Sequence, residues 1–194
     1  MVYNTPMKPY RIVLGSASPR RKELLSRIVP TFEVRPSSVD ERCLLTSPTQ
    51  YVMYTAAKKA LGTDVQDGEI LLTADTIVTI DGAFLGKPAD DRDAVSMLKR
   101  LNHRVNTVYT GVCLRTTDSI ELFYEASDVR IDMTEAEIEA YVAAGYAADK
   151  AGAYGIQDPT LRATLLRGSL DNVIGLPVEA VAARLVAFTR RNKE

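Results

Sequence analysis

Residues 70–82 read ILLTADTIVTIDG, and this stretch decides the class of fold. Two β-rich segments, 70–74 and 77–80, flank Asp75-Thr76, and the pair Asp81-Gly82 follows as a strong hairpin signal. A hairpin makes neighbouring strands antiparallel, whereas helices alternate with strands elsewhere in the chain. The combination predicts an α/β fold with a mixed, twisted sheet flanked by helices, and not a fully parallel one.

Asp75 is the unusual residue of this stretch. A carboxylate between apolar β segments is costly unless it is paired, bound to a metal or placed at a strand end that faces a cleft. The structural alternative is an aspartate at a bulge or strand break that hydrogen-bonds to the backbone. Because apolar segments flank it on both sides, we favour a functional role.

Further strands and helices are predicted on both sides of residues 70–82. Helices are expected to begin at Ser18-Pro19, at a capping box Ser47–Gln50, at Asp90 and at a capping box Thr134–Glu137, with stop signals at Gly62 and Gly145. The expected apolar stripe of the second helix is Met53, Ala56, Ala57 and Ala60. Other strands are expected at 10–14, 31–35, 104–115, 120–133 and 160–167, and a closing helix at 177–188. We expect one domain, 1–194, with a flexible start at about 1–9.

Composition excludes several classes of function. The 194 residues carry 24 basic and 25 acidic side chains, so no global basic field exists to attract nucleic acid. One histidine and two cysteines cannot make a four-ligand structural zinc site. An enzyme built from this chain is therefore expected to use carboxylates, lysines, arginines and an oxygen-ligated metal.

The chain shows no targeting signal that we recognise. Residues 1–9 lack the apolar core of a signal peptide, and no apolar run approaches the roughly 18 residues of a membrane span. Cys43 and Cys113 are interpreted as thiols in a reducing compartment and not as a disulfide. These features predict a cytoplasmic protein without a membrane partner.

The segment Ser16–Arg21 is a candidate phosphate site. It lies between a predicted strand and a helix N-terminus, where free N–H groups and the helix dipole attract anions. Ser16, Ser18, Arg20 and Arg21 add donors for phosphate oxygens. A simple helix start with solvated arginines is the alternative.

Other charged candidates are weak by themselves. Lys87 follows a glycine but is part of no Walker A loop, so an exposed turn lysine is the simpler interpretation. Glu41 lies in a polar loop and Lys59 on a helix, where solvated side chains are usual. Segment 149–157, Asp-Lys-Ala-Gly-Ala-Tyr-Gly-Ile-Gln, is more distinctive: its glycines permit close approach, and Gln157 can both donate and accept hydrogen bonds, as base recognition requires.

Together these segments resemble the Maf family of nucleoside triphosphate pyrophosphatases. The order and spacing agree from about residue 10 to the C-terminus, and the match over Asp149–Gln157 is the most specific. The other matching segments are Ser16–Arg21 with Glu23-Leu24-Leu25, Asp40-Glu41, Lys59-Ala60, Ala74–Thr76, Lys87-Pro88 and Gly175–Pro177. Two departures are Lys58, where relatives often carry an acid, and Gly15, where they usually carry alanine.

The resemblance implies a fold similar to inosine triphosphate pyrophosphatases, with two lobes around a deep cleft, commonly as a homodimer. It implies hydrolysis of a nucleoside triphosphate to the monophosphate and pyrophosphate with a divalent metal. The residue matching the family's proton acceptor is Asp75. Arg20, Thr76 and Gln157 match the positions that set base preference and look like the branch that prefers dTTP and UTP.

Physical reasoning adds candidate roles to this resemblance. Expelling pyrophosphate calls for neutralised charge, so Ser16, Ser18, Arg21, Lys59 and Lys87 become candidate phosphate contacts. Glu41 and Asp75 are candidate ligands for Mg²⁺ or Mn²⁺, which leaves open whether Asp75 is a base or mainly a metal ligand. Asp149 and Lys150 are further candidates. The competing hypotheses are a nucleotide-sensing protein that regulates cell division and a phosphohydrolase that releases orthophosphate.

Overall fold

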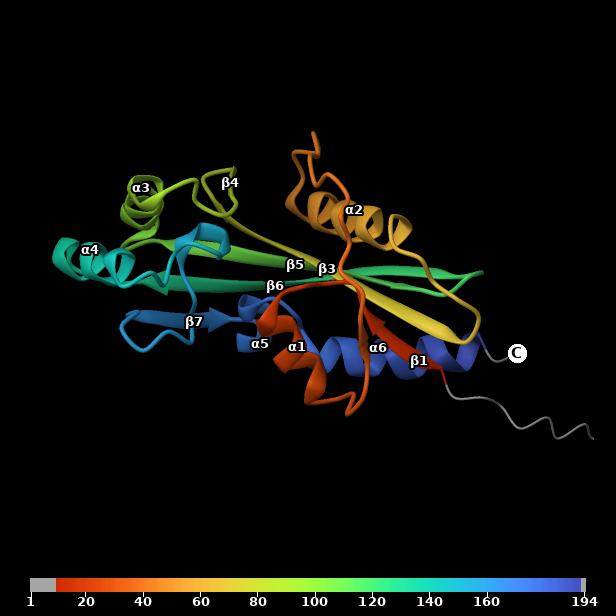
Figure 1. The fold of residues 1–194 in the computed structure, drawn as a ribbon. Coiled ribbons are helices and arrows are strands. Elements are labelled where there is room, and N and C mark those ends of the chain that lie inside the picture. The colour runs from red at the N-terminus through yellow and green to blue at the C-terminus, as the bar shows by residue number, and fades with distance from the viewer. Residues whose placement is uncertain (1–9, 193–194) are drawn as a thin grey trace, which may run out of the picture.

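Three long strands, β3, β5 and β6, form the centre of a seven-stranded sheet in the computed structural model, which describes residues 10–192 (Figure 1). The segment 1–9, for which a flexible start is predicted, lies outside the described residues. The strands are β1 Arg11–Leu14, β2 Glu33–Val34, β3 Glu69–Ile80, β4 Ala83–Leu85, β5 Val105–Arg115, β6 Ile120–Ile131 and β7 Ala163–Arg167.

The sheet is mixed, as predicted. Its strand order is β2-β1-β3-β5-β6-β7, and β4 pairs with the end of β3. The pairs β1–β2 and β1–β3 are parallel, and the other pairs are antiparallel. The predicted hairpin joins β3 to β4, and both Asp81 and Gly82 adopt the positive φ that such a turn requires.

The two segments 70–74 and 77–80 are one continuous strand, so the alternative of a bulge or strand break at Asp75 is wrong. Asp75 lies opposite Gly111 of β5, and Thr76 lies opposite Thr110, in an unbroken ladder. Because side chains alternate along a strand, Asp75 and Thr76 point to opposite faces of the sheet. The strand therefore offers a carboxylate to one face and a hydroxyl to the other.

Helices cover both faces of the sheet (Figure 1). Helix α2 packs on one face of the central strands, and α1 and α6 pack on the other, whereas α3 and α4 lie at the far end of the long strands. The helical segments are α1 Pro19–Ser26, α2 Pro48–Leu61, α3 Asp91–Leu101, α4 Glu135–Ala143, the 3₁₀ turn Ala151–Ala153, α5 Leu170–Ile174 and α6 Val178–Arg191. The 3₁₀ turn and α5 were not predicted.

Two main hydrophobic cores lie along β3. Leu72 belongs to the core formed with α1 and α6, and Val78 belongs to the core formed with α3 and α4. A smaller core between the sheet and α2 contains Leu71 and Cys113. The same strand therefore holds both ends of the molecule together, with Asp75-Thr76 between the two main cores.

Helix α2 starts where predicted but differs in detail. The Ser47 side chain makes no capping hydrogen bond; its Oγ lies 3.2 Å from Thr49 Oγ1, so the predicted capping box is wrong. The buried residues are Val52, Thr55, Ala56, Lys59 and Ala60, which means that the helix is rotated from the predicted stripe of Met53, Ala56, Ala57 and Ala60. The rotation turns Lys59 inward.

The end of α2 also has a different cause from the one predicted. Gly62 has φ −89°, so it is not a left-handed C′ residue. A Cβ at this position would lie 2.1 Å from Val39 Cγ1, and close packing therefore favours glycine here.

The other helix signals and the remaining boundaries agree more closely. Ser18 caps α1, Thr134 forms the predicted capping box, and Gly145 follows α4 with φ +80°. The strands predicted at 31–35 and 160–167 are shorter, at 33–34 and 163–167, and the closing helix extends to Arg191. Among residues 10–192, no helix combines the length and apolar character that crossing a membrane requires.

Candidate active site

A cavity of about 680 Å³ opens beside β3, between the two ends of the sheet. This volume is within the usual range for a small-molecule site. Every candidate site residue that the sequence predicts lines it, from six separate parts of the chain. The lining includes Ser16, Ser18, Arg20, Arg21, Glu41, Lys59, Asp75, Thr76, Lys87, Asp149, Lys150 and Gln157.

The turn before α1 forms one wall of the cavity. Ser16 Oγ accepts a hydrogen bond of 3.3 Å from the Ser18 N–H, and Ser18 Oγ accepts one of 3.4 Å from the Arg21 N–H. The serine side chains thus hold the strand-to-helix turn in place while the first turn of α1 faces the cavity. The helix N-terminus is consequently oriented as an anion site requires.

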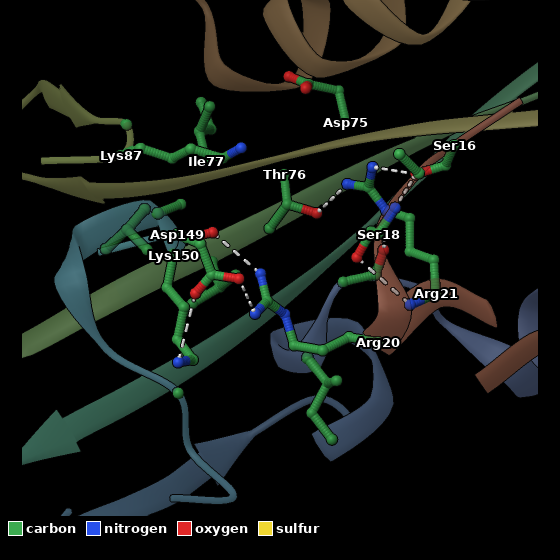
Figure 2. Close-up of a pocket in the computed structure, with 18 of the residues that line it drawn as sticks. Ser16, Ser18, Arg20, Arg21, Asp75, Thr76, Ile77, Lys87, Asp149 and Lys150 are labelled. Carbon is green, nitrogen blue, oxygen red and sulfur yellow. Dashed lines mark hydrogen bonds and ion pairs between the residues drawn. The ribbon is translucent and has the colours of Figure 1, made fainter. Parts of the chain in front are cut away.

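Arg21 crosses from α1 to three other parts of the wall (Figure 2). Its Nε donates to Gly175 O at 2.9 Å, Nη1 to Ser16 Oγ at 3.4 Å and Nη2 to Thr76 Oγ1 at 3.1 Å. Desolvation lowers the pKa of Arg21, and the charges of Asp75 and Glu41 oppose that effect. Arg21 is therefore a fixed cation whose orientation the surrounding acceptors determine.

Arg20 bridges the mouth of the cavity to the loop at 149–157. Its Nη1 donates to Asp149 Oδ2 at 2.8 Å, and Nη2 donates to Asp149 O at 3.0 Å (Figure 2). Desolvation acts to raise the pKa of Asp149, but the hydrogen bond and charge of Arg20, together with Lys150, outweigh it and lower that pKa. The bridge ties the N-terminus of α1 to the segment that carries Gln157.

A buried lysine in the cavity wall contacts two carboxylates. Lys59 Nζ lies 2.8 Å from Asp75 Oδ1 and 2.9 Å from Glu41 Oε2. Asp75 and Lys59 are both buried, whereas Glu41 is exposed. The rotation of α2 described above is what aims Lys59 at Asp75.

The donor set of this cluster fits a magnesium ion shared with a substrate. Within residues 10–192 no group of three or more His, Cys, Asp or Glu side chains forms a complete protein cage for a metal. Glu41 and Asp75 nevertheless place carboxylate oxygens on either side of one ammonium group. Mg²⁺ is usually held by one or two carboxylates, with phosphates and waters as its other ligands.

The loop 149–157 is held by a tyrosine that the sequence did not identify. Tyr141 of α4 donates to Asp158 Oδ2 at 2.5 Å and accepts a hydrogen bond of 3.0 Å from the Gly155 N–H. A Cβ on Gly155 would lie 2.7 Å from both Asp158 Oδ2 and Lys150 Cε, which explains the glycine. Gln157, just beyond, is exposed at the cavity wall.

Lys150 is held by groups of its own loop and of the residues beside it. Its Nζ donates to Tyr146 O and lies 3.4 Å from Asp158 Oδ2 and 3.5 Å from Asp149 Oδ1. These contacts fit a residue that shapes the loop. Lys87, which follows β4, lines the cavity beside this loop, because the Gly152 N–H donates to Gly86 O at 3.0 Å.

Behind the wall, polar side chains connect Thr76 to the interior. Thr76 Oγ1 lies 2.9 Å from Thr110 Oγ1, and Thr110 Oγ1 donates to Asn172 O at 3.0 Å. Thr110 and Asn172 are fully buried. Thr110 belongs to an ordinary alternating strand pattern, so nothing in the sequence marked it as functional.

Comparison with known proteins gives a consistent result. A family model described as Maf-like protein matches residues 11–188. The chain is 41% identical to a dTTP/UTP pyrophosphatase of Thermococcus onnurineus (strain NA1), over 88% of this chain and 94% of that protein. It is 39% identical to a dTTP/UTP pyrophosphatase of Bacillus cereus (strain AH187), over 92% and 95%.

Two solved structures are also similar in part. A HAM1 protein from Coxiella burnetii matches with a TM-score of 0.48 and 14% identity, over 92% of this chain and 99% of that one. The Staphylococcus aureus Ham1 protein matches with a TM-score of 0.44 and 13% identity, over 62% and 71%.

Proposed function

This chain belongs to the Maf family, and from that membership we propose that it hydrolyses nucleoside triphosphates, preferably dTTP and UTP, to the monophosphate and pyrophosphate. The protein is a nucleoside triphosphate pyrophosphatase, an enzyme class that the names of its relatives carry. The observation that best connects this activity to the chain is the buried pair of Lys59 and Asp75 in the wall of the cavity, with the exposed Glu41 carboxylate also in contact with Lys59.

The reaction places water on the α-phosphorus and expels pyrophosphate. The leaving group is a polyanion, so catalysis depends mostly on positioning and on neutralising charge. Arg21 is held by three acceptors and faces the cavity beside the N-terminus of α1. Together with Ser16, Ser18, Lys59 and Lys87, it supplies the donors for phosphate oxygens in this proposal.

Asp75 is the proposed acceptor of the water proton. Its carboxylate is buried in the cavity wall, and Lys59 fixes one of its oxygens through a 2.8 Å contact. The other oxygen is available to a water or to a metal. A bound Mg²⁺ or Mn²⁺ would be held by Asp75 and Glu41 and would supply charge neutralisation and a more acidic water.

The base is proposed to lie against Arg20, Thr76 and Gln157. Thr76 and Gln157 come from β3 and the loop 149–157, and both line the cavity. The bridge from Arg20 to Asp149 holds that loop next to α1, so that three distant segments face one ligand. This arrangement supports a single nucleotide site.

A cytoplasmic homodimer is part of the same proposal. The exposed apolar side chains Leu122 and Tyr124 on β6 are the kind of surface that a second subunit covers. Light scattering of the purified protein tests the dimer.

A net charge of −1 supports the expectation that nucleic acid is not a partner.

An assay of a nucleotide panel with product identification tests the function. We expect dTTP and UTP to give the monophosphate and pyrophosphate in the presence of Mg²⁺. Release of orthophosphate and a diphosphate would indicate the other phosphohydrolase, and binding without any product would indicate a nucleotide sensor. Either result would overturn the proposal.

A further inference from the structure

A line of hydrogen-bonding groups runs from the cavity wall into the buried interior. Arg21 Nη2 donates to Thr76 Oγ1 at 3.1 Å, Thr76 Oγ1 lies 2.9 Å from Thr110 Oγ1, and Thr110 Oγ1 donates to Asn172 O at 3.0 Å. Figure 2 shows the cavity end of this line, where Arg21 meets Thr76. Thr110 is fully buried and is not among the lining residues.

The groups at the two ends of this line determine which atom donates in each of its hydrogen bonds. Asn172 O is a backbone carbonyl, which can only accept, so Thr110 gives its single proton to that oxygen. Thr110 can then only accept from Thr76, and the Thr76 proton points inward. At the other end, Arg21 can only donate, so it takes one lone pair of Thr76.

Thr76 Oγ1 can therefore only accept a hydrogen bond from a ligand, through its remaining lone pair. Its proton is committed to Thr110, and reversing the line would leave a buried carbonyl without its donor, at a cost of about 1–3 kcal/mol. An ionised triphosphate has no hydrogen to donate, so Thr76 is unsuited to phosphate. The donor that thymine and uracil present and cytosine lacks is the N3–H.

Gln157 cannot make the same distinction by itself. Its amide presents a donor and an acceptor, and it is exposed on its loop. Rotating the amide by half a turn exchanges the two groups, so the same side chain can pair with the carbonyl and N3–H of uracil or with the N3 and amino group of cytosine. Discrimination needs a group whose polarity cannot reverse, and Thr76 is such a group.

We propose that Thr110 is a specificity-positioning residue, which fixes Thr76 as an acceptor for the N3–H of thymine or uracil and thereby excludes cytosine. This inference rests on the proposed function and deepens it. It assigns the choice between the two pyrimidine types to a residue that does not touch the nucleotide.

The test compares kcat/KM for dTTP and dCTP, which carry the same sugar. Wild type is expected to prefer dTTP on the order of ten- to hundred-fold, the range expected for a buried unpaired polar group. Thr110→Val keeps the shape of the side chain but frees the Thr76 proton, so Thr76 can donate to the N3 of cytosine. The ratio is expected to fall to within about threefold of unity, with dCTP gaining as dTTP loses.

Three further variants separate this effect from a loss of structure. Thr110→Ser keeps the hydroxyl and is expected to keep the ratio. Thr73→Val is the matched control, because Thr73 is equally buried on β3 and donates to Ala56 O at 2.6 Å but does not line the cavity. It is expected to lower the unfolding temperature and leave the ratio unchanged. Gln157→Ala is expected to slow both substrates by similar factors.

The outcomes distinguish the inference from the function on which it rests. A wild type without preference for dTTP over dCTP would refute the base preference and the inference together. If Thr110→Val retains the preference for dTTP, the inference alone is refuted. An equal loss of kcat/KM for both substrates would also refute it, because that result would place a sugar hydroxyl against Thr76. If Thr110→Val does not fold, Thr76→Val is the second variant, and a retained ratio there is equally contradictory.

Discussion

The Lys59 ammonium lies 2.8 Å from the Asp75 carboxylate inside the cavity wall, and both side chains are nearly inaccessible to solvent. A buried pair of this kind orients each partner more strictly than a surface pair does. Asp75→Asn keeps the shape but removes the charge. We expect kcat to fall by about 100-fold or more, since a base or metal ligand is lost.

The matched control for this substitution is Asp81→Asn. Asp81 directly follows the same strand, but its partner is the exposed Arg104, and it does not line the cavity. Activity close to wild type is expected for this control. Circular dichroism should show that both variants fold, and near-wild-type kcat in Asp75→Asn would remove Asp75 from the proposed chemistry.

Activity is expected to require Mg²⁺ or Mn²⁺ and to disappear with EDTA. The described lining of the cavity contains carboxylates but no histidine or cysteine, and two of these carboxylates, Glu41 and Asp75, contact Lys59, a proposed phosphate contact. Glu41→Gln should raise the Mg²⁺ concentration needed for half-maximal rate. The measurement is a metal titration of the initial rate, and full activity after exhaustive chelation would contradict the prediction.

Acid should destabilise the protein through Glu69. This carboxylate is buried, and its hydrogen bonds from Arg35 and from the Gln66 N–H, with a smaller contribution from Arg11, outweigh desolvation and hold its pKa below the ordinary value. Because the folded pKa is depressed, the stabilisation is present above the unfolded pKa and is lost as the pH falls through the folded pKa.

Denaturant unfolding of wild type and Glu69→Gln from pH 7 to pH 3 measures this contribution. The variant is expected to be less stable by about 1–3 kcal/mol at pH 7 and to converge on wild type in acid. A constant difference across this range would show that Glu69 does not titrate as described.

The two thiols should differ in reactivity. Burial raises the pKa of Cys113 to about 12, whereas Cys43 is partly exposed. The reactive form is the thiolate. Alkylation of the native protein at pH 8, followed by peptide mass spectrometry, should therefore label Cys43 and spare Cys113 until denaturant is added. Equal labelling of both would show that the smaller core opens readily.

Gly111→Ala should disturb the site by displacing α2, the helix that carries Lys59. A Cβ there would lie 2.4 Å from the backbone carbon of Val52, so α2 would have to move away from β5. We expect a loss of stability of about 1–3 kcal/mol, as for other overpacked sites. A lower kcat is also expected because α2 carries Lys59. Thermal unfolding and initial rates measure both effects, and an unchanged unfolding temperature would contradict the packing argument.

Local signals predicted much of the fold because they depend on neighbours in the chain. The hairpin at Asp81-Gly82 and the capping box at Thr134 are fixed by two to four residues. The rotation of α2 was missed because it depends on Asp75, which lies 16 residues from Lys59 and attracts it into the wall. The short helix α5 was missed because its five residues show no period.

The residues of the candidate site likewise fall into those that the sequence predicted and those that it did not. Chemically distinctive residues such as Arg21 and Asp75 were identified from their types and their surroundings. Tyr141 and Thr110 were not, because a tyrosine on a helix and a threonine on a strand are ordinary until the packing shows what they touch. Supporting residues of this kind are determined by the three-dimensional arrangement.

Strand β3 passes through both main cores, with Leu72 in one and Val78 in the other. The two ends of the molecule therefore share one unbroken hydrogen-bonded ladder and are joined without a hinge at Asp75-Thr76. Unfolding of either end would break backbone hydrogen bonds of the strands that the other end shares. We therefore expect a single cooperative unfolding transition. Because β3 is continuous, the part of the cavity wall that it forms is already in place before a nucleotide binds. Any conformational adjustment to the nucleotide is expected in the loops that line the cavity.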